Sequence, residues 1–189
     1  DMAMQRKGLC ATKCRTPKEW RESEQGKVVL GLPPLCFQPM RGGSKRGARA
    51  LPDRAARPLS DVIVVDFSHV IASPVVGRTL ADYGATVIKV ISHERPRREM
   101  FDCETNHGKR TLCVELGTEA GRQKLWDLLK VADVLIDGFA NKALGRRGFG
   151  MDEVLRRNPH LVYLDLTCFG HAGPLSHGKG FQQNANFAA

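Results

Sequence analysis

The sequence has no apolar run that approaches the 18 or more residues needed to cross a lipid bilayer, although 42% of its 189 residues are hydrophobic. Aromatic residues are also scarce, at 6% of the chain. A chain of this length can nevertheless bury one sizeable core. We therefore expect a soluble globular protein without a membrane span.

Three motifs that carry nucleotide or ester chemistry are missing. The turn after the first apolar run reads Ser-His-Val-Ile-Ala-Ser-Pro over residues 68–74, without the G-x-G-x-x-G spacing of dinucleotide-binding folds. No phosphate loop ending in Gly-Lys-Ser/Thr and no G-x-S-x-G turn occur either. These absences argue against NAD-dependent, P-loop and serine-hydrolase functions.

A metal-binding pattern is absent as well. Cys10 and Cys14 enclose three residues, and no second Cys or His pair lies at a matching distance, so we expect no metal site. Cys113 and Cys168 fall in apolar patterns, where a buried thiol is ordinary. Reduced cysteines and an intracellular location are expected, with the compartment undetermined.

Acidic residues are rare in the first third of the chain. Residues 1–60 carry 13 of the 29 Lys and Arg residues but 5 of the 20 Asp and Glu residues. This basic region lacks interleaved aromatics, so we expect no nucleic-acid partner. Residues 1–58 are predicted to form a basic, Gly- and Pro-containing arm or linker, disordered or loosely ordered, with an isolated strand over Val28–Phe37 as a weaker alternative.

From residue 59 onward, short apolar runs alternate with amphipathic segments. The runs predict strands and the segments between them predict helices, in the order strand 62–67, helix 74–83, strands 86–91 and 110–116, helix 118–131, strand 133–139, helices 141–147 and 151–157, and strand 161–168. This alternation is typical of an α/β fold, an open parallel sheet with helices on both faces. Ligands bind such sheets outside the carboxyl ends of the strands.

Five sequence blocks resemble class III CoA-transferases, the CaiB/BaiF family, in order and spacing. They are DFSHVIASP (66–74), LADYGATVIKV (80–90), NHGKRTL (106–112), ADVLIDGF (132–139) and NPHLVY (158–163) followed by FGHAGP (169–174). The resemblance covers residues 59–189 and implies the N-terminal part of a Rossmann-like large domain, incomplete relative to the family. It also implies a homodimer in the full-length protein.

The resemblance implies a transferase that moves CoA from an acyl-CoA thioester to a free carboxylic acid. In the family, an aspartate attacks the thioester and forms first a mixed anhydride and then an aspartyl-CoA thioester. That aspartate is expected beyond residue 189. CoA is then a substrate and not a tightly bound cofactor, and we expect the isolated chain to be inactive.

The resemblance also assigns individual positions. His69 matches an active-site histidine of formyl-CoA transferases, although a histidine that only caps the next helix or satisfies loop carbonyls is the alternative. Ala72 matches a backbone contact to CoA. Ile71 stands where formyl-CoA transferase has Gln, which favours an apolar acyl group over formate or oxalate.

Further matches concern the remainder of CoA. Phe139 and Arg146 match contacts to its nucleotide end, an aromatic face for adenine and a guanidinium for phosphate, although Arg146 could also be a solvated helix end. Lys179 matches a pocket lysine. Gly138 replaces the usual Asn. A loop with Arg95, Arg97 and Arg98 is a further candidate for phosphate binding, on charge alone.

Two other functions remain open at this point. One is an α-methylacyl-CoA racemase-like isomerase, but Phe181 stands where racemases of the family carry His, and phenylalanine cannot act as a base. The other is a non-catalytic CoA-binding or dimerisation fragment. A fragment that folds poorly by itself is also considered, because a parallel sheet must be covered on both faces.

Overall fold

The structure is a computed structural model that describes residues 2–39, 57–93 and 99–188. The chain divides into two units. The sheet unit comprises Met40–Phe139 and Leu144–Asp165, and the terminal unit comprises Asp1–Pro39, Ala140–Ala143 and Leu166–Ala189. The predicted domain boundary between residues 58 and 59 stays a prediction.

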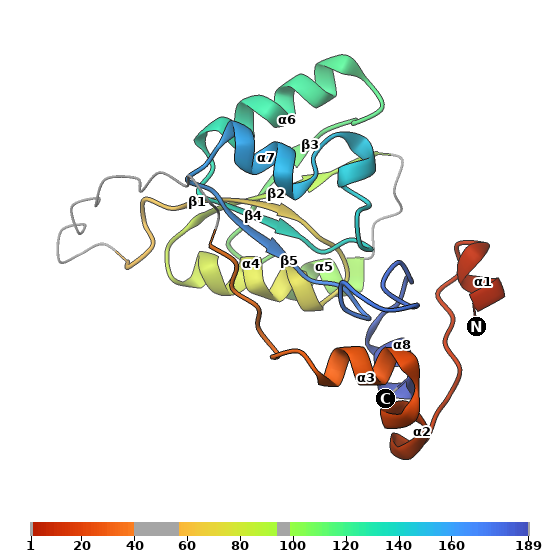
Figure 1. The fold of residues 1–189 in the computed structure, drawn as a ribbon. Helices are drawn as coiled ribbons and strands as arrows, with labels where there is room; N and C mark the ends of the chain where they lie inside the picture. Colours follow the sequence, from red (N-terminus) through yellow and green to blue (C-terminus); the bar gives the residue numbers. More distant parts are fainter. Residues whose placement is uncertain (1, 40–56, 94–98, 189) are drawn as a thin grey trace. The chain divides into compact units, whose positions relative to one another are not determined.

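The sheet unit is built on five parallel strands in the order β3-β2-β1-β4-β5. The strands are β1 Ile63–Phe67, β2 Thr86–Ile91, β3 Arg110–Cys113, β4 Val134–Asp137 and β5 Val162–Asp165. The predicted open parallel α/β sheet is therefore confirmed (Figure 1).

Helices cover both faces of this sheet, as predicted (Figure 1). They are α4 Ala72–Asp82 on one face and α6 Glu119–Val131 and α7 Met151–Arg157 on the other, with α5 Glu99–Thr105 and a 3-10 turn, Gly145–Arg147, in the connections. Successive residues of a strand point to opposite faces, so neighbouring valines join different cores. Val64 packs in the cluster that includes Ala81 of α4, and Val65 in the cluster that includes Leu125 of α6.

The strand order places the ends of β1 and β4 side by side. From β1 the chain moves outward through β2 and β3, and then returns to the other side of β1 as β4 and β5. The register pairs Phe67, the last residue of β1, with Asp137, the last residue of β4. The two loops that follow therefore leave the sheet at its topological switch point, where open α/β sheets bind ligands.

Helix α4 begins two residues before its predicted start. Pro74 lies in its first turn, where a missing N–H costs nothing, and not at its first residue. The residue before the helix, Ile71, has an apolar side chain and makes no cap hydrogen bond. Its side chain therefore leaves the N–H groups of the first turn uncapped. In contrast, the Thr118 hydroxyl caps α6 by accepting a hydrogen bond from the Gly121 N–H at 3.0 Å.

The terminal unit contains four helices among its described residues: α1 Met2–Arg6, α2 Pro17–Glu22, α3 Glu24–Leu30 and α8 Gln182–Ala188. The strand considered over Val28–Phe37 is wrong. Ser23 caps α3 through the Gly26 N–H, and the helix ends where Gly31, Pro33 and Pro34 follow. The Gly-rich run from residue 40 to 50 lies outside the described residues.

A buried glutamine joins the two ends of the terminal unit. Gln25 donates its side-chain amide to the carbonyl oxygens of Phe169 and Ala172, each at 2.8 Å, and accepts the Leu175 N–H at 2.7 Å. Trp20 packs in the same cluster as Phe169 and Leu175. Helices α2 and α3 thus contribute to a core with residues 169–188.

Within the described ranges, no helix has the length and apolar character that a bilayer crossing requires.

Candidate functional site

His69 and Phe139 meet at the switch point of the sheet. His69 lies two residues after β1 and Phe139 two residues after β4. Their rings stack with centroids 5.0 Å apart and planes inclined by 27°, and the Phe67 ring meets Phe139 edge-on at 6.5 Å. His69 is exposed and Phe139 half-buried, so this pair forms a surface that solvent and a ligand can reach.

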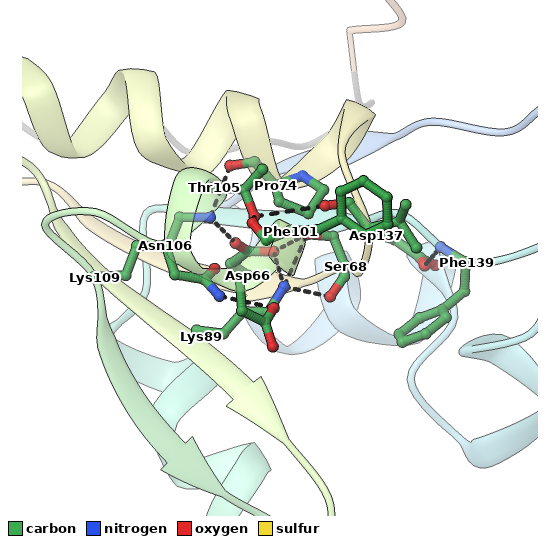
Figure 2. Close-up of polar contacts among 12 residues, drawn as sticks. Asp66, Ser68, Pro74, Lys89, Phe101, Thr105, Asn106, Lys109, Asp137 and Phe139 are labelled. Atoms are coloured by element: carbon green, nitrogen blue, oxygen red, sulfur yellow. Dashed lines mark hydrogen bonds and ion pairs between the residues drawn. The ribbon is translucent and has the colours of Figure 1, made fainter. Parts of the chain in front are cut away.

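A buried group of charges lies around Asp66, in contact with Ser68 and Pro74 on either side of His69 (Figure 2). Asp66, fully buried near the end of β1, accepts a hydrogen bond from the Lys109 ammonium at 2.7 Å, and the Lys89 ammonium lies 3.8 Å from its other oxygen. Ser68 donates its hydroxyl to Asp66. Charges this deeply buried persist only when they are paired and hydrogen-bonded.

The two lysines also reach the backbone around the loop. Lys89 donates to the carbonyl oxygen of Ser68, and Lys109 donates to that of Pro74 at 2.7 Å. Burial lowers the pKa of the Lys89 ammonium; the Lys109 charge adds to the decrease and the Asp66 carboxylate opposes it.

The loop itself has an unusual backbone. Val70 has φ +72°, in the left-handed region that β-branched residues rarely adopt. Ile71 and Ala72 follow, both exposed, and lead directly into the first turn of α4. Free N–H groups at a helix start carry partial positive charge, which suits a phosphate or a polarised carbonyl oxygen.

Asp137 organises the second loop. One of its carboxylate oxygens accepts the Phe139 N–H at 3.1 Å, and the other accepts the Tyr163 hydroxyl at 2.9 Å. Burial, together with the Asp137 charge and hydrogen bond, raises the pKa of the Tyr163 hydroxyl well above its ordinary value. Tyr163 therefore stays protonated and fixes the carboxylate that positions Phe139.

Gly138 is tightly enclosed by the first loop and the start of α4. A Cβ at this position would lie 2.4 Å from the Ser73 hydroxyl oxygen, 2.5 Å from its Cβ and 2.7 Å from the Ser68 Cβ. No side chain fits there without displacement of α4. The absence of a side chain at Gly138 thus leaves room for the Ser73 side chain.

The sequence-predicted residues fall into both units. His69, Ala72, Phe139 and Arg146 belong to the sheet unit, and Arg146 lies exposed in the 3-10 turn. Lys179 belongs to the terminal unit, where its ammonium lies 3.4 Å from the Gly8 carbonyl oxygen. A shared site that includes Lys179 stays a prediction.

The arginines proposed for phosphate binding, Arg95, Arg97 and Arg98, lie outside the described residues.

Sequence reasoning missed the network around Asp66. Its signal was present, because Asp66 and Lys89 each interrupt an otherwise apolar strand pattern. A charge in a strand buried on both faces needs a partner, and a partner in the neighbouring strand was the simplest candidate. Among the described residues, no group of three or more His, Cys, Asp or Glu side chains is arranged to hold a metal ion.

Comparison with known proteins gives consistent matches. The model of CoA-transferase family III matches residues 59–189. The chain is 38% identical over 136 residues to the acetyl-coenzyme A transferase nodX of Hypoxylon pulicicidum, covering 70% of this chain and 23% of that protein. It is 31% identical over 189 residues to an acyl-CoA transferase of Gibberella moniliformis, covering 97% of this chain and 33% of that protein. This second similarity extends into the N-terminal arm.

A solved structure matches as well. The crystal structure of Rv3272 from Mycobacterium tuberculosis superposes with a TM-score of 0.63 at 34% identity, covering 67% of this chain and 36% of that one. The chain therefore spans about a quarter to a third of the two curated relatives and just over a third of this structure.

We predict that Gly138→Asn destabilises the fold by about 1–3 kcal/mol, because the new side chain overlaps Ser73 and Ser68. Adding Ser73→Gly should recover part of the loss, since it removes two of the three close contacts. Urea unfolding measures both effects. Gly117→Asn is the control, because a Cβ there meets nothing within 4 Å. Equal losses of unfolding free energy in Gly138→Asn and Gly117→Asn, or no recovery on adding Ser73→Gly, would contradict the close packing of Gly138 against Ser73.

Tyr163→Phe should lower the free energy of unfolding by about 1.5–3 kcal/mol at neutral pH, because the hydrogen bond to the Asp137 carboxylate is lost. The pKa of Tyr163 is raised in the folded state, so the folded chain keeps the proton that the unfolded chain releases above about pH 10. The contribution of Tyr163 is therefore complete below pH 10 and declines above it. Unfolding free energies at pH 8 and pH 11 should show a smaller difference between wild type and variant at pH 11; an unchanged difference would refute the assignment.

Proposed function

Because the chain belongs to CoA-transferase family III, we propose that it forms the CoA-binding part of an acyl-CoA:carboxylate CoA-transferase. Such an enzyme moves CoA from a thioester to a free carboxylic acid. The observation that carries the proposal is the His69–Phe139 pair at the switch point, where an exposed imidazole adjoins an aromatic ring.

The groups around this pair suit the parts of CoA. Phe139 offers an aromatic face to adenine, and the exposed Arg146 guanidinium suits a phosphate. The backbone at Ala72, at the start of α4, suits the thiol arm or a phosphate oxygen. In this arrangement a ring N–H of His69 donates a hydrogen bond to the thioester oxygen. Lys179 is proposed as a further contact, and the exposed Ile71 favours an apolar acyl group.

The short separation of the two rings restricts how CoA binds. CoA in an extended conformation is far longer than the 5.0 Å between the ring centroids of His69 and Phe139. Adenine at Phe139 and the thioester at His69 therefore require CoA to bend back on itself. The proposal accordingly includes a bent CoA.

Neither buried carboxylate at the strand ends is available as the nucleophile. Asp66 is fully buried and engaged by two lysines and Ser68, and Asp137 is held by Tyr163 and the Phe139 N–H. We propose, as the family resemblance implies, that the aspartate which forms the acyl and CoA intermediates is not among residues 1–189. In this proposal the chain binds CoA without turnover, and the complete enzyme acts as a homodimer.

We expect Phe139→Leu to weaken CoA binding about tenfold, the equivalent of ~1.4 kcal/mol for a lost aromatic contact. Isothermal titration of the purified chain with CoA measures this affinity. Leucine keeps the site apolar and so preserves packing against Phe67. Phe37→Leu is the matched control, because Phe37 is 88% exposed and lies in the terminal unit.

The same preparation, mixed with an acyl-CoA and an acceptor acid, should give no CoA exchange by mass spectrometry. Exchange by the isolated chain would overturn the placement of the nucleophile. Deuterium uptake at the acyl α-carbon without an acceptor would favour the isomerase instead. Absence of CoA binding, or equal effects of the two phenylalanine variants, would refute the proposed site.

A further inference from the structure

The buried charges around Asp66 join three separate elements of the sheet unit. Asp66 lies in β1, Lys89 in the neighbouring strand β2, and Lys109 directly before β3 (Figure 2). The Lys89 side chain is 6% exposed and the Lys109 side chain 1%. This group therefore lies in the interior and does not belong to the solvated surface.

Hydrogen bonds from this group bracket the loop that carries His69. Lys89 donates to the carbonyl oxygen of Ser68, the residue before His69, and Lys109 donates to that of Pro74 in α4. Ser68 is held a second time, through its hydroxyl, by Asp66. Residues 69–73 are thus anchored at both ends by lysines that share one carboxylate.

The loop between these anchors is strained. Val70 adopts φ +72°, a left-handed conformation that is strained for a β-branched residue. Such a conformation persists only where the surrounding structure enforces it. Thr105 adds a contact from α5, with its hydroxyl 3.5 Å from the Val70 carbonyl oxygen.

Stability alone gives a weak reason for this arrangement. Burial of charged groups carries a large desolvation cost, and well-packed apolar residues often replace buried ion pairs without loss of stability. Hydrogen-bonded charges do, however, fix geometry in a way that apolar contacts cannot, which is what a reacting group requires.

We propose that Lys89, Lys109 and Asp66 are positioning residues, which hold the 68–74 loop so that His69 stacks on Phe139 and the start of α4 faces the ligand. The function of this loop rests on the proposed CoA site. The positioning itself is a property of the free protein and can be tested without CoA.

The test uses the NMR signals of the His69 ring in the full chain. Stacking on Phe139 places these protons in its ring current, and His69→Gln assigns them by their disappearance. Lys89→Met removes the donor to Ser68 but leaves Lys109 paired with Asp66. We expect the His69 ring signals to lose the ring-current shift and move to the positions of a histidine that stacks on no aromatic ring, while circular dichroism remains that of the wild type.

Three further variants complete the test. Lys130→Met is the control, because it breaks an exposed ion pair with Asp127 in α6 and should leave the His69 signals unchanged. Ser68→Ala removes only the hydroxyl bonded to Asp66 and should shift the His69 signals partly, with recovery in Ser68→Thr. If Lys89→Met does not fold, the two Ser68 variants test the positioning role in its place.

Wild-type His69 signals in folded Lys89→Met, or in Ser68→Ala if that variant must decide, would overturn the proposal. A CoA titration of the same samples separates the two hypotheses. If the His69 signals shift as expected but the wild type does not bind CoA, the positioning role stands and the CoA site fails. If the wild type binds CoA and the His69 signals of the variants do not shift, the CoA site stands and the positioning role fails.

Discussion

The parallel pairing of β1 with a strand on each side is the constraint from which the rest of the sheet unit follows. Because β2 and β4 flank β1, the sheet grows from β1 through β2 and β3 on one side and through β4 and β5 on the other. The register then places the end of β1 beside the end of β4. The loops that start there bring His69 and Phe139 into contact, although 70 positions separate them in the sequence.

Burial of the central strand on both faces makes any charge within it costly, yet Asp66 lies there. Two lysines and a serine satisfy it, and the same lysines hold the backbone on either side of the His69 loop. The carboxylate at the end of β4 acts similarly for Phe139, through Tyr163. Buried charges at the two strand ends thus lie directly beneath the groups that we propose to contact CoA.

The sheet, the helices on both faces and the positions of both loops could be predicted, because the apolar runs at 62–67 and 133–139 and the amphipathic segments between them have clear periodicity. The helical structure of the arm could not. Its core depends on Trp20 and Gln25 meeting residues more than 140 positions away, a long-range contact that no local pattern encodes. The Asp66 network was missed for a similar reason, since its lysine partners lie far along the chain, in β2 and directly before β3. Only the two charges in apolar runs signalled it.

The most direct test of the account is the position of CoA relative to the two stacked rings. Nuclear Overhauser effects between bound CoA and the labelled chain measure it. We predict contacts from the adenine protons to the Phe139 ring and from the methylene protons beside the thiol to His69, as a bent CoA requires. Contacts of both rings with the same end of CoA, or of neither ring with CoA, would contradict the account.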